Sequence, residues 1–382
     1  MMEKVTFRCE SCGSTMEFDA KEQMLKCPHC GTCTPIEDRE ETVIEHPLTL
    51  DARRKIRVEE KETKTIECSG CGAKIEVEQF DASVECPYCG SSYILANEQQ
   101  ETLIPDGVVP FRVDQKRVKE LFHQWMKGRF FAPNALKSLY QRDKFLGIYL
   151  PYWTFDAKVH CSYTGRGGIT RTEHYKDSEG KEQTRVVIDW YYVHGTLEHF
   201  FDDVTVPATK RFYSGFFQGI EPFAFQELKS YSKAYLSGYL AEQYSVDLEQ
   251  GHKEAIKKVQ QMLYQMAEQE IERRYDCADS IHISPHFSDE TYKYILVPVY
   301  STSYQFKGKQ YHVLINGQNG KIKGEYPKSP VKVAIATISI IIMLVLLYFL
   351  FSGLTHADTK VSQQTGEMET AVVMEEGKDY DI

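Results

Sequence analysis

The spacing of the cysteines constrains this chain more than any other feature. Nine of its eleven cysteines lie in the first 89 residues, and eight of these form four Cys-x-x-Cys pairs, each followed by a glycine. The last two pairs repeat the first two at an offset of 59 residues, which indicates an internal duplication. The paired residues are Cys9, Cys12, Cys27, Cys30, Cys68, Cys71, Cys86 and Cys89.

Two zinc ribbons, each with four cysteine ligands, explain this pattern. Zn²⁺ takes four ligands in a tetrahedron, and four thiolates complete its shell without an open position. The glycine after each pair permits the left-handed backbone that a loop needs to turn beneath a metal. A module of about 35 residues cannot bury a self-sufficient core, so the metal would contribute much of its folding free energy. We therefore expect two structural zinc sites, in ribbons at residues 1–35 and 65–96.

Three other chemistries use similar cysteine pairs. Disulfide bonds need an oxidising compartment, and the first ten residues, MMEKVTFRCE, lack the apolar segment of a signal peptide. A thioredoxin-like centre uses one Cys-x-x-Cys pair, not four in register. A rubredoxin-like iron site uses similar loops, so iron stays open as the alternative ion. The remaining cysteines have no matching partner, and we expect ordinary thiols at Cys33, Cys161 and Cys277.

A second constraint lies near the C-terminus. Residues 333–351 read VAIATISIIIMLVLLYFLF and carry no charge. Because about 20 apolar residues span a bilayer core, this run predicts a single transmembrane helix at residues 331–351. Positive charge prefers the cytoplasmic side, and the lysines cluster before the helix, so we expect a single-pass cell-membrane protein with a cytoplasmic N-terminal part and an external tail. The preceding lysines are Lys321, Lys323, Lys328 and Lys332.

Between these two features, tyrosine and phenylalanine concentrate in residues 108–327, which we predict to be the principal folded domain. A charged linker at residues 36–64 and an acidic tail at residues 352–382 complete the organisation. Strands before and after a long helix predict the α+β class. Helices are predicted at 114–130, 134–140 and 247–275, strands at 148–163, 185–193, 197–206, 281–284, 292–306 and 310–315, and a glycine-rich turn at 165–168.

Catalytic motifs are missing from the sequence. It contains no Gly-x-x-x-x-Gly-Lys-Ser/Thr phosphate loop, no His-Glu-x-x-His and no Gly-x-Ser-x-Gly. We therefore predict that the chain is not an enzyme and that it has no catalytic residues.

The charge distribution argues against nucleic acid as the partner. Of the net charge of −10, residues 1–102 carry −9, the tail carries −5, and the part between them carries +4. A polyanion would be repelled by the predicted ribbons and would release few counterions there. We expect protein partners for this acidic surface instead.

Several segments resemble one bacterial family. The run LPYWTFDA at 150–157, followed by Tyr163-Thr164-Gly165, is similar to a signature of bacterial zinc-ribbon membrane proteins. The closing segments GKQY at 308–311, INGQNGK at 315–321 and GEYPKS at 324–329 resemble the same group. These proteins are often labelled TFIIB-type zinc-ribbon proteins, or after the primosomal helicase subunit N′. The resemblance covers most of the chain from Cys9 to the predicted membrane helix.

The resemblance implies a function. The group includes a membrane anchor encoded in phage-shock-type envelope-stress operons of Gram-positive bacteria, which serves with an SPFH-domain partner and a PspA-like coat protein. By this resemblance we expect a membrane-anchored adaptor that recruits such cytosolic proteins. A nucleic-acid-binding or helicase-associated regulator and an unrecognised membrane-bound enzyme are the alternatives.

Overall fold

The computed structural model describes residues 7–36, 43–56, 63–67, 74–78, 81–85, 92–94, 103–134, 136, 145–176, 178, 180–210 and 214–349. The chain divides into two compact units. The larger unit contains the described residues of Met1–Trp125 and Arg142–Glu325. The smaller contains those of Met126–Gln141 and Tyr326–Ile382.

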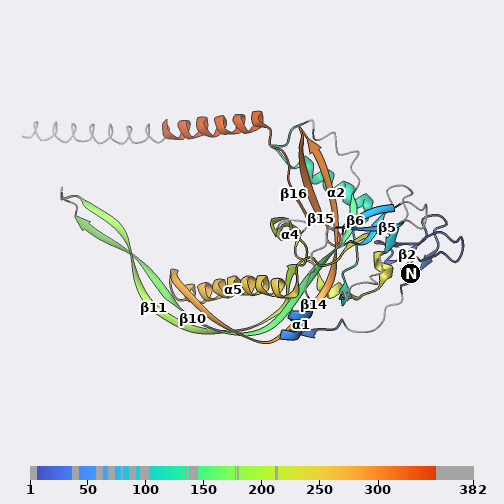
Figure 1. The fold of residues 1–382 in the computed structure, drawn as a ribbon. Helices are drawn as coiled ribbons and strands as arrows, with labels where there is room; N and C mark the ends of the chain where they lie inside the picture. Colours follow the sequence, from blue (N-terminus) through green and yellow to red (C-terminus); the bar gives the residue numbers. More distant parts are fainter. Residues whose placement is uncertain are drawn as a thin grey trace, which may run out of the picture. The chain divides into compact units, whose positions relative to one another are not determined.

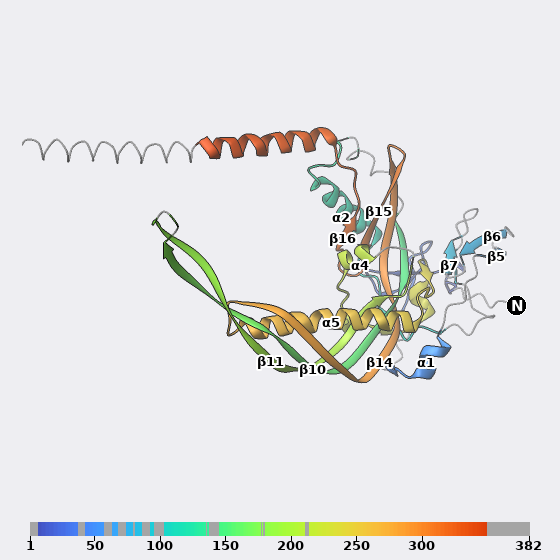
Figure 2. The ribbon, with the colours of Figure 1, turned by 60° about the vertical axis from the view of Figure 1, so that its left-hand side comes forward.

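Three long antiparallel strands dominate the larger unit. They are β10 (Leu146–Lys176), β11 (Glu182–Pro207) and β14 (Cys277–Phe306), and β10 pairs with both of the others. The helix α5 (Leu248–Glu272) lies along the concave side of this curved sheet (Figures 1 and 2). The mixed α+β class with a large sheet is thereby confirmed.

Shorter strands extend the sheet to eleven strands among the described residues. The main path runs β12 (Lys229–Ser230), β9 (Gly107–Val108), β14, β10, β13 (Leu240–Glu242), β7 (Asp81–Glu85) and β8 (Ser92–Ile94). Joined to β14 are β4 (His46–Pro47) and β15 (Lys309–Asn316), and β15 pairs in turn with β16 (Ile322–Gly324). Two small sheets stand apart: β1 (Glu17–Asp19) with β2 (Met24–Lys26) and β3 (Cys33–Thr34), and β5 (Thr63–Glu67) with β6 (Lys74–Glu78).

Bulges bend the long strands around α5. The register of β10 shifts at Asp156 against both neighbours, and Asp203 and Asp289 at these shifts have positive φ angles of 51°. Aspartate tolerates this left-handed conformation better than most residues. One carboxylate oxygen of Asp156 accepts the backbone N–H of Asp203 at 2.6 Å, and the other accepts the hydroxyl of Thr291 at 3.0 Å. Asp156 therefore fixes the bend.

The long helix α5 follows directly from its sequence. Asp247 is the N-cap, and its side chain accepts the backbone N–H of Gln250 at 2.8 Å, which satisfies a donor that the helix cannot pair itself. The buried side recurs at helical spacing along the whole helix. Its members are Leu248, Gly251, His252, Ala255, Val259, Leu263, Ala267 and Ile271. The predicted helix at 247–275 is confirmed.

Trp153 on β10 is the centre of the contact between α5 and the sheet. It is fully buried, and its indole N–H donates to the carbonyl of Val246 at 2.9 Å. The rings of Tyr244 and Tyr294 lie 5.4 and 5.1 Å from its own. Gly251 leaves room for the indole, since a Cβ there would lie 2.6 Å from Trp153 Cδ1.

After α5, the longest helix that begins in the described part of the larger unit is α2 (Gln115–Lys127). Asp114 caps α2 by accepting the backbone N–H of Arg117 at 2.7 Å, so the predicted helix from residue 114 is confirmed. The predicted helix at 134–140 lies almost entirely outside the described residues. The short helices are α1 (Leu50–Lys55), α4 (Ser214–Ile220) and the 3-10 turns η2 (Phe225–Glu227) and η3 (Lys233–Leu236).

One prediction for this part of the chain is wrong. The glycine-rich segment 165–168 lies inside β10 and is not a turn. The glycines are needed for packing, because a Cβ on Gly167 would lie 2.3 Å from the ring of Tyr275. A Cβ on Gly168 would lie 2.7 Å from the sulfur of Cys277.

The segment predicted as a charged linker at 36–64 is partly packed in its described portion. His46 and Pro47 form β4 beside β14, and Ile56 is buried in the core cluster that contains Trp153. The imidazole of His46 also contacts the carboxylate of Asp106 at 2.7 Å.

The smaller unit contains an apolar helix at Pro330–Phe349. Its mean hydropathy is 2.5, none of its most apolar window is buried, and it is long enough to cross a bilayer once. Lys332 joins its start to the loop at 130–134: the ammonium donates to the carbonyls of Phe130 and Ala132 and to the side-chain oxygen of Asn134 at 2.8–3.1 Å. The predicted span at 331–351 agrees with this helix, and the predicted tail at 352–382 lies outside the described residues.

We expect Gly251→Ala to destabilise the protein even though alanine favours helix more than glycine does. The new methyl group would displace Trp153, and such overpacking costs about 1–3 kcal/mol, against a gain of about 1 kcal/mol in helix propensity. Urea unfolding followed by tryptophan fluorescence measures the difference. Gln261→Ala, at an exposed position of the same helix, is the control and should change the midpoint little; equal midpoints for both variants would contradict the packing argument.

Candidate metal centre

Two equivalent loops bring the first four paired cysteines together. In each loop the glycine N–H donates to the carbonyl of the first cysteine, Gly13 to Cys9 at 2.8 Å and Gly31 to Cys27 at 2.9 Å. The glycine φ angles are 74° and 77°, in the left-handed region where a side chain is strained. The predicted need for glycine after each pair is confirmed at these two positions.

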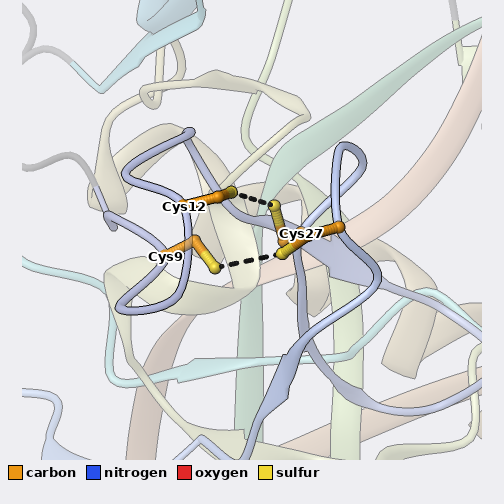
Figure 3. A group of neighbouring side chains, drawn as sticks. Cys9, Cys12 and Cys27 are labelled. Carbon is orange, nitrogen blue, oxygen red and sulfur yellow. Dashed lines mark hydrogen bonds between the residues drawn. The ribbon is translucent and has the colours of Figure 1, made fainter.

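The four sulfur atoms form a compact group (Figure 3). Those of Cys9 and Cys30 lie 3.5 Å apart, as do those of Cys12 and Cys27, and all four lie within 4.8 Å of one another. A tetrahedral ion with metal–sulfur bonds of about 2.3 Å needs sulfur atoms about 3.8 Å apart. The four thiols therefore suit a metal ion. Cys9 and Cys27 are buried and Cys12 and Cys30 are exposed, so one side of the group faces solvent.

Hydrogen bonds and burial shift the pKa values of Cys30 and Cys27 in opposite directions. The hydroxyl and backbone N–H of Thr32, followed by the thiols of Cys12 and Cys9, lower the pKa of Cys30 to about 6. The N–H of Cys30 favours the thiolate of Cys27, but burial and the neighbouring thiols outweigh it and raise the pKa of Cys27 to about 11. Near neutral pH Cys30 would therefore offer a thiolate to a metal ion held by the four cysteines.

The second predicted set cannot be compared with the first. Cys68, Cys71, Cys86 and Cys89 lie outside the described residues. Of the described strands nearby, β7 and β8 join the large sheet, in which Ser83 of β7 lies opposite Ala241 of β13, and β5 and β6 form a separate sheet.

The first cysteine loop pair is packed against the α+β domain. Phe18 of β1 is buried, and its ring lies 5.3 Å from that of Tyr235 and 6.4 Å from that of Tyr239. The N–H of Phe18 donates to the carbonyl of Ser237 at 2.9 Å, and the Ser237 hydroxyl donates to the carbonyl of Met16 at 2.7 Å. No local sequence pattern predicts this contact, since its two sides are more than 200 residues apart.

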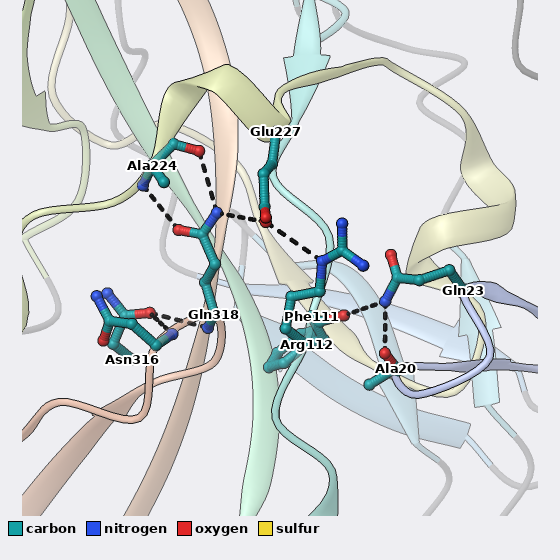
Figure 4. Close-up of polar contacts among 9 residues, drawn as sticks. Ala20, Gln23, Phe111, Arg112, Ala224, Glu227, Asn316 and Gln318 are labelled. Atoms are coloured by element: carbon teal, nitrogen blue, oxygen red, sulfur yellow. Dashed lines mark hydrogen bonds and ion pairs between the residues drawn. The ribbon is translucent and has the colours of Figure 1, made fainter.

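A polar network continues beside this contact (Figure 4). Gln23 donates to the carbonyl of Phe111 at 2.7 Å, and the next residue, Arg112, pairs with Glu227 at 3.2 Å. Glu227 also accepts the side-chain amide of Gln318 at 2.9 Å. The pKa of Glu227 is lowered by Gln318 and Arg112, so the carboxylate stays charged and holds these segments together.

A second cluster of potential ligands contains its own cation. The carboxylates of Asp156, Asp202 and Asp203 lie within 4.8 Å of one another. The ammonium of Lys293, which is 7% exposed, lies 2.8 Å from Asp203, 3.5 Å from Asp156 and 3.0 Å from Glu45. Burial opposes the charge of Lys293, but these carboxylates raise its pKa above the ordinary value. The ammonium of Lys293 therefore balances part of the negative charge of this cluster. The sequence offered one sign of it, a lysine inside the apolar run 292–299.

Two of the segments that resemble the bacterial family lie in β10 and at the turn after β15. Residues 150–157 form a continuous buried run near the start of β10. Asn316 is fully buried and organises the turn after β15: its amide donates to the carbonyl of Ile220 at 2.9 Å, and its side-chain oxygen accepts the N–H of Gln318 at 2.8 Å. These residues stabilise the fold, and they do not converge on a common site.

Comparison with known proteins gives one similar chain. A Bacillus subtilis (strain 168) protein, named "Uncharacterized protein YdjG", is 27% identical over 342 residues, which cover 86% of this chain and 92% of that protein. No family model matches the chain. No solved structure matches it.

We expect loss of the metal ligands to loosen more than the cysteine loops. Replacing Cys9 and Cys27 by serine should raise amide hydrogen exchange in residues 7–36 and also in residues 233–239, because Phe18 and Met16 pack or bond there. Cys33→Ser is the control, since Cys33 is exposed and not part of the four-sulfur group. Faster exchange confined to residues 7–36 would show that the contact with residues 233–239 does not depend on the metal site.

Proposed function

We propose that this chain is a membrane-anchored zinc-ribbon adaptor that recruits cytosolic partner proteins to the membrane. The observation that carries the proposal is the presence, in one chain, of a four-cysteine group packed against a folded domain and of an exposed apolar helix of bilayer length. Such a chain has a stabilised surface for binding and a means of staying at a membrane.

Zinc is the ion that we propose for the four thiols. An all-sulfur tetrahedral shell suits structural zinc, leaves no position for substrate, and is stable in a reducing cytosol. We propose a second such site at Cys68, Cys71, Cys86 and Cys89, because the spacing and the following glycines repeat. The role of both sites is then structural.

The lysines that flank the apolar helix indicate the orientation that we propose for the chain in the membrane. The lysines before it place the N-terminal part in the cytoplasm by the positive-inside rule, which agrees with metal-bound thiolates. Lys332 has its ammonium bound by two backbone carbonyls and Asn134 at the helix start, which suits a residue at the membrane boundary.

Protein partners suit the surface better than nucleic acid does. Residues 1–102 carry a net charge of −9, so a polyanion would be repelled. The chain also lacks a nucleotide-binding loop and a hydrolase motif, which argues against a motor or an enzyme. By resemblance to the zinc-ribbon membrane proteins, we propose SPFH-domain or PspA-like proteins as partners, in the envelope-stress response.

Crosslinking in membranes tests the proposal. An SPFH-domain or PspA-like protein should be recovered with the full-length chain, and deletion of residues 331–382 should move the chain and that partner together to the cytosol. Replacement of Cys9 and Cys27 by serine should reduce recovery of the partner, with Cys33→Ser as the control. Recovery of nucleic acid instead, or retention of the truncated chain at the membrane, would contradict the adaptor reading.

A further inference from the structure

The outer edge of β11 is open in the part of the chain that the structure describes. There β11 pairs only with β10, over 26 residues, so every second backbone N–H and C=O along its other side has no strand partner. An open edge of this length is a template for another strand.

This edge lacks the usual protection against strand addition. Proteins normally place lysine, proline or bulges along such an edge. Between Val186 and Phe201, before the bulge at Asp203, the sequence contains no lysine, arginine or proline. The pairing of β11 with β10 also runs without a register shift from Lys176 opposite Glu182 to Ala157 opposite Phe201.

The far part of the same hairpin has too few strands to be stable alone. Pairing of β14 with β10 ends at Gly168 opposite Cys277, so β10 and β11 continue beyond it as a two-stranded ribbon. An isolated two-stranded hairpin is marginally stable in water, and a third strand usually supplies the missing stability. Apolar side chains of β11 are exposed in this ribbon, Val186 by 69% and Ile188 by 39%. Trp190 and Tyr192, in the adjoining part where β10 also pairs with β14, are exposed by 39% and 92%.

We propose that β11 pairs antiparallel with β11 of a second copy of this chain, about a two-fold axis at Trp190. A two-fold axis pairs one surface with itself, so the open edge of each copy is completed by the other. The two-stranded part of each hairpin then gains the partner's β11 as a third strand. This inference does not depend on the proposed adaptor function.

The pattern of side chains selects the register. With the axis at Trp190, Ile188 lies opposite the partner's Tyr192 on one face, and Val187 lies opposite the partner's Val193 on the other. Aromatic and β-branched pairs of this kind stabilise antiparallel strands. Between Gln183 and Leu197 no two like charges are opposed.

A neighbouring register is less favourable. An axis at Asp189 would place two aspartates directly opposite each other, and like charges in that position are destabilising. The charges along this edge are thus compatible with a second copy paired about Trp190.

Paired charge substitutions test both the partner and the register. In the proposed dimer Ile188 and Tyr192 face each other twice, so Ile188→Lys with Tyr192→Lys should weaken self-association about tenfold or more, because like charges oppose. Ile188→Lys with Tyr192→Glu carries the same number of new charges, but opposite signs meet across the axis. This second variant should stay close to wild type. Sedimentation equilibrium of the full-length chain in detergent micelles measures both.

The outcomes distinguish a second copy of this chain from a different protein as the partner of this edge. A monomeric wild-type chain would overturn the proposal. Equal dimerisation of the two variants would also overturn it, since association would then come from another surface such as the apolar helix. A photoreactive residue in place of Tyr192 should crosslink to residues near 188 of a second copy in membranes; crosslinking to a different protein would contradict the assignment.

Discussion

The closure of four thiols around one point is the interaction on which the N-terminal part of this protein depends. Residues 7–36 have short strands and few buried side chains, so they cannot hold their fold by hydrophobic burial alone. Once Cys9, Cys12, Cys27 and Cys30 are fixed, Phe18 is held against Tyr235 and Tyr239. A four-cysteine group that is local in sequence is thereby linked to a contact that is distant in sequence.

In the large sheet, three long strands have to curve in order to pack around one helix. Bulges at Asp203 and Asp289 bend the strands, and Asp156 holds them with hydrogen bonds. Three carboxylates at the bend would repel one another, and the buried ammonium of Lys293 compensates them. The bend brings β10 and α5 together at Trp153 and leaves the far hairpin as a ribbon with an open edge.

Features with local physical causes could be predicted from the sequence. Asp247 and a regular apolar stripe predicted α5, and Cys-x-x-Cys-Gly predicted the two loops around Gly13 and Gly31. Features with distant causes could not. The glycines at 165–168 were predicted to form a turn, because glycine clusters usually do. Gly167 is required instead by the ring of Tyr275, which lies more than 100 residues away in the sequence and has no local signal. The burial of Ile56 and the contact of Phe18 with the domain are hidden for the same reason.

The identity of the bound metal and the atoms that ligate it are the properties on which the proposed zinc ribbons depend most directly. X-ray absorption at the zinc edge, combined with metal analysis of the purified full-length chain, measures both. We predict about two zinc ions per chain, each with four sulfur ligands at about 2.3 Å. Iron in place of zinc, oxygen or nitrogen ligands in the shell, or no bound metal would contradict the zinc-ribbon account.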